Sequence, residues 1–65
     1  MTVAAISDRI LEALTYKGPM TVDELETELQ IQKPYLRRGL AMLMDEGKIE
    51  GRGSKGRLIQ AVRHG

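Results

Sequence analysis

The sequence predicts an α+β fold in which three helices precede a two-stranded β-hairpin, all within one domain over residues 1–65. Three observations predict it. Apolar residues recur every three or four positions in the first 46 residues, the spacing of helix faces that pack on a core. Cap and stop residues divide that stretch into three segments. Beyond residue 47, three glycines interrupt a basic stretch between two short β-prone runs.

The first helix is expected at about residues 3–17. The apolar positions that recur at helical intervals here are Val3, Ile6, Ile10 and Leu14. Leu11 widens this stripe and belongs either to the core or to a protein interface. The helix should end at Gly18 and Pro19, because glycine accepts the left-handed conformation after a last turn and proline cannot continue the helical hydrogen bonds.

The second helix is expected at about residues 22–29, after a short extended stretch at Met20. The Thr21 hydroxyl can cap this helix while Glu24 reaches back to the amide of the cap residue. The apolar residues of the segment share one face, and they are Val22, Leu25 and Leu29. A short, capped, amphipathic helix is therefore predicted here.

A third helix should follow at about residues 34–46, with Pro34 in its first turn and Gly47 after its last. Its predicted buried stripe is Leu36, Leu40 and Leu43, helped by Met44. Gly39 inside this helix costs about 1 kcal/mol relative to alanine. It could permit close approach to another backbone, but we expect it to be a small residue that fits against the second helix. The short connection between the second and third helices is the spacing of a helix-turn-helix.

Two strands joined by a flexible basic loop are expected at about residues 48–62. The loop spans residues 51–56, which include Gly51, Gly53 and Gly56. Leu58, Ile59 and Val62 cannot all point to the same face of a pleated strand, so the sequence leaves the buried face of the second strand open. Residues 63–65 are expected to form a frayed tail.

Over nearly its whole length the chain resembles the winged helix-turn-helix family of DNA-binding proteins. The likeness is carried by the Thr21-Val22-Asp23-Glu24-Leu25 start of the second helix, by Leu36, Leu40, Leu43, Gly47 and Ile49, and by the basic hairpin of residues 51–57. The resemblance implies that the third helix is a recognition helix for the major groove and that the hairpin is a wing on the DNA backbone or in the minor groove.

Two positions depart from the family pattern. Glu26 stands where members usually place a small residue, and Gln30 stands where many carry glycine. Either the turn between the second and third helices is looser than usual, or Glu26 reaches a basic neighbour such as Arg37 or Arg38.

The charge is unevenly distributed along the chain. Residues 1–30 carry two basic and six acidic residues, a net charge of −4, whereas residues 31–65 carry eight basic and three acidic residues, a net charge of +5. Such asymmetry predicts that one surface meets a polyanion.

We expect duplex DNA to be that polyanion. The residues expected to contact it are Gln32, Lys33, Tyr35, Arg37 and Arg38 of the third helix and its start, and Arg52, Ser54, Lys55 and Arg57 of the wing. Arginine can grip guanine or a phosphate with two hydrogen bonds, and backbone amides at a helix start also attract phosphate. The charges of the wing are expected to be free of other partners.

The alternative interpretation is a protein interaction module of the same fold that does not bind DNA. Its contact surface would be the acidic first two helices, or a face that includes Leu11, Tyr35 or Met42. In either case a homodimer is expected, because a chain this short buries only roughly 60% of its unfolded surface and winged helices commonly read two half-sites.

Other classes of function are not expected. The chain has no cysteine, and its one histidine, His64, lies in the predicted tail, so neither a metal site nor a cofactor is expected. Its size leaves little room for a catalytic cleft, and the glycine-rich loop precedes no helix, so we expect no enzyme. Without a secretory leader or an apolar run of roughly 20 residues, a cytoplasmic prokaryotic or phage regulator of transcription or DNA processing is expected.

Overall fold

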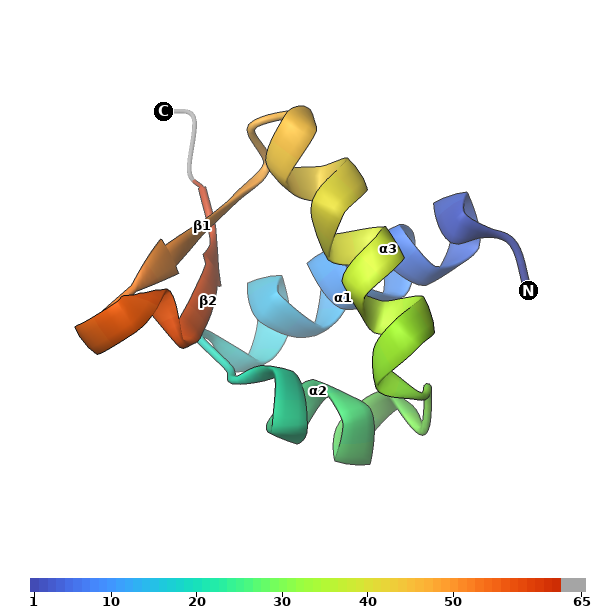
Figure 1. Ribbon diagram of the computed structural model, residues 1–65, viewed down its shortest axis with the longest axis horizontal. Helices are drawn as coiled ribbons and strands as arrows, with labels where there is room; N and C mark the ends of the chain where they lie inside the picture. The colour runs from blue at the N-terminus through green and yellow to red at the C-terminus, as the bar shows by residue number, and fades with distance from the viewer. Residues whose placement is uncertain (63–65) are drawn as a thin grey trace.

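Three helices and a β-hairpin follow one another in the computed structural model, which describes residues 1–62 (Figure 1). The elements are α1 (Val3–Lys17), α2 (Val22–Leu29), α3 (Lys33–Asp45), β1 (Ile49–Arg52), the 3-10 turn η1 (Ser54–Gly56) and β2 (Leu58–Ala61). This is the three-helix winged helix-turn-helix arrangement, so the predicted fold class is confirmed. The predicted tail and His64 lie outside the described residues.

The first two helices begin at threonine caps, of which the sequence predicts the one at Thr21. At α1, the Thr2 hydroxyl accepts a hydrogen bond from the Ala5 amide at 3.1 Å. At α2, the Glu24 amide donates to the Thr21 hydroxyl at 3.1 Å, and the Thr21 amide donates to the Glu24 carboxylate at 3.0 Å. This reciprocal capping box satisfies two amides that a helix start otherwise leaves unpaired.

The third helix begins at Lys33, one residue earlier than expected, and Pro34 occupies its second position. Its end is closed by two backbone hydrogen bonds, from the Gly47 amide to the Met44 carbonyl at 3.0 Å and from the Lys48 amide to the Leu43 carbonyl at 2.9 Å. Gly47 has a φ of 68°, the left-handed conformation that this closing motif requires.

The second strand of the hairpin lies between two partners. On one edge it pairs antiparallel with β1, with Gly51 opposite Ile59 and Ile49 opposite Ala61. On its other edge, the backbones of Met20 and Ile59 exchange hydrogen bonds of 2.9 and 2.8 Å. Ile59 and Ala61 pack against the core, which settles the face that the sequence leaves open.

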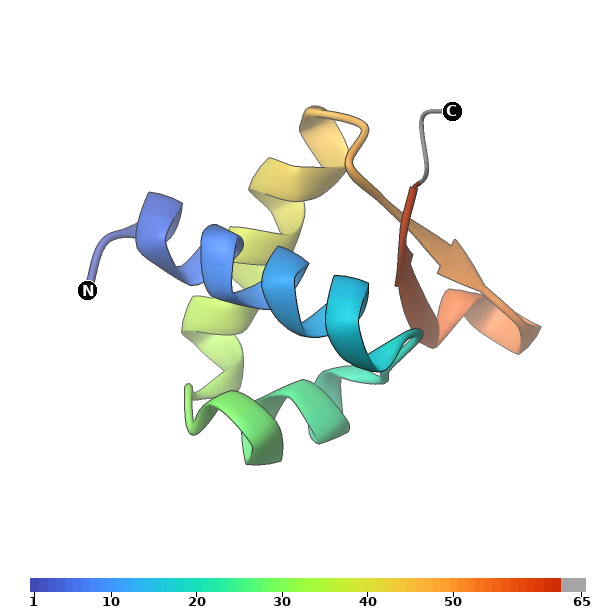
Figure 2. The ribbon, with the colours of Figure 1, turned by 180° about the vertical axis from the view of Figure 1, so that it is seen from behind.

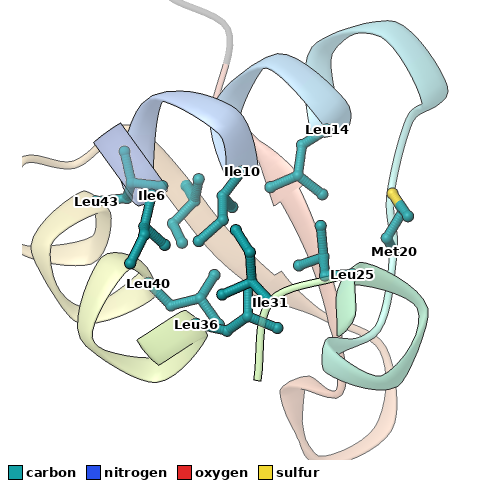
Figure 3. Packing of buried hydrophobic residues seen from close by; sticks show 10 residues of the cluster. Ile6, Ile10, Leu14, Met20, Leu25, Ile31, Leu36, Leu40 and Leu43 are labelled. Carbon is teal, nitrogen blue, oxygen red and sulfur yellow. The ribbon is translucent and has the colours of Figure 1, made fainter. Parts of the chain in front are cut away.

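One apolar cluster holds the helices and the hairpin together (Figure 3). Its buried residues are Ile6, Ile10, Leu14, Met20, Leu25, Ile31, Leu36, Leu40, Leu43 and Ile49. Two residues predicted to be buried are exposed instead, Val3 to 38% and Met44 to 55%. Val3 is exposed because the first turn of α1 extends beyond α3 (Figures 1 and 2). Met44 is exposed because it lies about 100° around α3 from the buried Leu43.

Gly39 faces α1, so the expectation that it fits against the second helix is wrong. A Cβ atom at this position would lie 2.9 Å from Ile6 Cγ2 and 3.0 Å from Ile10 Cδ1. The missing side chain therefore lets α3 approach α1. None of the helices within residues 1–62 is long and apolar enough to cross a membrane.

Candidate nucleic-acid interface

An open groove of about 500 Å³ lies between the start of α2, the first half of α3 and the wing. It is lined by Thr21, Val22, Asp23, Lys33, Arg37, Lys55, Arg57 and Ile59, and we call it the basic groove. Four of the nine residues predicted to contact DNA meet here, although two come from α3 and two from the wing. The sequence could group each pair, but only the fold brings the pairs together.

Each cation reaches the groove through a local feature of the chain. Lys33 and Arg37 are four residues apart on α3 and therefore share a face. Gly53 and Lys55, with Ser54 between them, have positive φ angles of 80° and 61°, and these two residues turn the chain at the tip of the wing. Within residues 1–62, the side chains of Arg37, Lys55 and Arg57 are exposed and form no ion pair.

Lys33 has a partner inside the groove. Its Nζ lies 2.6 Å from Asp23 Oδ1, so the pair joins the first turn of α2 to the first turn of α3. The hydrogen bond with Asp23, and then the charge of Asp23, raise the pKa of Lys33, and the same interactions lower the pKa of Asp23. Sequence reasoning missed Asp23 as a groove residue because an acidic residue in the first turn of a helix is ordinarily explained by the helix dipole.

The charge of Glu26 also contributes to the raised pKa of Lys33, after that of Asp23. Within residues 1–62, Glu26 forms no ion pair with Arg37 or Arg38. Gln30 closes α2 with a φ of 55° and a ψ of 42°, and its amide donates to the Glu26 carbonyl at 2.9 Å. Gln30 thus adopts the left-handed conformation that glycine adopts at lower cost.

The other predicted residues of α3 lie outside the basic groove. Gln32 and Tyr35 line a separate hollow beside the start of α1, together with Met1, Ile6, Gln30 and Ile31. Arg38 is exposed on α3, and Ser54 is exposed in the turn of the wing. The predicted residues are therefore not gathered in one place, because only four line the basic groove and two line the second hollow.

Arg52 is engaged on the hairpin, contrary to the expectation that the wing charges are free. Its guanidinium donates to Gln60 Oε1 at 3.1 Å, and the Gln60 amide donates to the Glu50 carboxylate. The strand register places Glu50 opposite Gln60, and alternate residues of a strand share a face. Arg52 and Gln60 line a hollow beside Gly18 and Pro19, away from the basic groove.

The two residues proposed for a protein interface differ in exposure, since Leu11 is half-buried and Met42 is 37% exposed. Leu11 is partly buried against the core. Met42 lies beside α1, where its sulfur accepts a hydrogen bond from the Ser7 hydroxyl at 3.7 Å. Neither forms part of the basic groove.

The basic groove combines four cations with one carboxylate, a charge balance that favours an anionic ligand. In the part of the chain that the structure describes, no three His, Cys, Asp or Glu side chains are placed to hold a metal ion. Comparison of the chain with protein-family models, with curated proteins and with solved structures finds no match in any of the three.

Proposed function

We propose that this protein binds duplex DNA and acts as a small winged helix-turn-helix regulator of transcription or DNA processing. The observation that carries the proposal is the meeting of Lys33, Arg37, Lys55 and Arg57 around one open groove between α3 and the wing. Phosphates repeat closely along a DNA strand, so a row of exposed cations can neutralise several of them together.

The two parts of this surface would have different tasks. The groove cations would hold the phosphate backbone and fix the position of the domain. Arg38, exposed on α3 outside the groove, would reach base edges in the major groove, where arginine binds guanine with two hydrogen bonds. A homodimer on two half-sites belongs to the same proposal, and sedimentation at micromolar concentration tests it.

The protein-interaction alternative has less support. Leu11 is partly buried against the core, and Met42 and Tyr35 keep 37% and 49% of their surface exposed. Isolated exposed apolar side chains such as these are common on protein surfaces and do not by themselves indicate a partner. The exposed cations of the basic groove have a direct use only with an anionic partner.

The test is a titration of random-sequence duplex DNA at low and moderate salt with three proteins, the native chain, Arg37→Ala and Arg9→Ala. Arg9 is the matched control, because it is exposed and basic but lies on α1 outside the groove. Lys33 is paired with Asp23, so about three phosphates should be neutralised by the other groove cations, and the logarithm of the affinity should fall with the logarithm of salt with a slope of about −2.7. We expect Arg37→Ala to weaken binding and Arg9→Ala to leave it nearly unchanged.

The proposal fails if the native chain does not bind below the ~100 μM range of non-specific complexes, if salt has no effect, or if the two variants behave alike. Selection of bound sequences from a random duplex pool then identifies a preferred site. On that site Arg38→Ala should cost more affinity than on random DNA, because a base contact is lost as well as a charge.

A further inference from the structure

Asp23 is the one acidic residue among those that line the basic groove. Its carboxylate lies 2.6 Å from the Lys33 ammonium. A phosphate oxygen that approached Lys33 would be repelled by the negative charge of this carboxylate. It would also have to replace the carboxylate as the partner of the ammonium. The side chains of Asp23 and Lys33 are 79% and 39% exposed, so either can exchange its partner with an incoming ligand.

Asp23 is not needed to cap α2. The capping box formed by Thr21 and Glu24 already satisfies the amides of those two residues. The carboxylate of Asp23 is instead turned to Lys33, in the first turn of the neighbouring helix α3. Its position thus affects the ligand surface directly.

We infer that Asp23 competes with DNA phosphate for Lys33 and thereby lowers the affinity of the groove for duplex DNA of arbitrary sequence. This rests on the proposed function. When the groove binds the phosphate backbone less tightly, a stable complex depends more on contacts with the bases. Asp23 is therefore a specificity-determining residue. It acts through Lys33 and need not touch DNA itself.

The experiment compares Asp23→Asn with Glu24→Gln on random-sequence duplex DNA. Both substitutions remove one negative charge from the first turn of α2, and glutamine can keep the capping box. Only Asp23 lines the basic groove. We expect Asp23→Asn to bind roughly twofold to fivefold more tightly than the native chain, as for release of an exposed ion pair, and Glu24→Gln to change much less.

Two further readouts isolate the role of Lys33. The salt slope of Asp23→Asn should be steeper by about 0.9, because one more cation is free to neutralise a phosphate. In a Lys33→Met background, Asp23→Asn should no longer give the full gain, since the ammonium for which the carboxylate competes is gone. Asp23→Ser provides a second variant, and thermal melting establishes that each protein is folded.

The outcomes separate the two proposals. If no protein binds duplex DNA, the proposed function falls and this inference falls with it. If the native chain binds but Asp23→Asn and Asp23→Ser bind no more tightly than Glu24→Gln, the inference alone is overturned. An undiminished gain in the Lys33→Met background likewise overturns it, because Asp23 would then act by general repulsion.

Discussion

Gly39 of α3 lies so close to Ile6 of α1 that a Cβ atom at residue 39 would stand 2.9 Å from Ile6 Cγ2. We therefore expect Gly39→Ala to lower the free energy of unfolding by about 1 kcal/mol. The overpacking costs roughly 1–3 kcal/mol, which exceeds the gain in helix propensity of about 1 kcal/mol. Urea denaturation followed by circular dichroism measures the change.

Ala41→Gly is the matched control, because Ala41 is exposed on the same helix. It should cost about 1 kcal/mol through helix propensity alone. A Gly39→Ala protein more stable than the native chain would show that α1 and α3 are not closely packed at this point.

A second prediction concerns Gln30, which has a φ of 55° at the end of α2. We expect Gln30→Gly to raise the free energy of unfolding by roughly 0.5–1 kcal/mol. Relief of the left-handed backbone is worth about 1–2 kcal/mol, and the greater freedom of glycine in the unfolded chain offsets part of it. The same change at Thr27, inside α2, should destabilise the protein, and equal effects at the two positions would contradict the prediction.

Lys55 allows stability and ligand binding to be separated. Its φ of 61° suits asparagine better than lysine, so Lys55→Asn should keep or raise the melting temperature. The same substitution removes a groove cation, so affinity for random duplex DNA should fall and the salt slope should become shallower by about 0.9. Lys48→Asn is the control, since Lys48 lies outside the groove. Equal losses of affinity in the two variants would count against the groove.

The Asp23–Lys33 pair makes a prediction about pH. Lys33 holds the pKa of Asp23 below its ordinary value, so the stabilisation from charged Asp23 is present at neutral pH and is lost as pH falls through that lowered pKa. The raised pKa of Lys33 keeps its contribution until the pH rises through that value in the alkaline range. Both groups are exposed, so the effect on stability is small.

An NMR titration of the Asp23 carboxyl group measures this pair directly. In Lys33→Met the pKa of Asp23 should move upward, whereas Lys48→Met should leave it where it is in the native protein. An unchanged pKa in Lys33→Met would mean that the two side chains do not interact in solution.

The features that the sequence predicts well are those set by neighbouring residues. The Thr21–Glu24 capping box depends on a spacing of three residues, and the end of α3 depends on the left-handed freedom of Gly47. Helical period likewise identifies most of the core. Val3 escapes this reasoning, because the first turn of α1 extends beyond α3, and Met44 is exposed because it lies about 100° around α3 from Leu43.

The candidate site is less accessible from sequence, since it depends on contacts between distant segments. The basic character of residues 31–65 is evident, but the separation of Arg52 from Arg57 follows from the register that places Gln60 opposite Glu50. The pairing of Asp23 with Lys33 follows from the packing of α2 against α3. Neither the strand register nor the packing of the two helices can be predicted from composition or from the spacing of apolar residues.

The paired backbones of Met20 and Ile59 also determine where a force on the wing is felt. Because β2 is held on both edges, a pull on the tip of the hairpin passes along that strand to Met20, which directly precedes the cap of α2. The hairpin and the first turn of α2, which lines the basic groove, are therefore connected through hydrogen-bonded backbone.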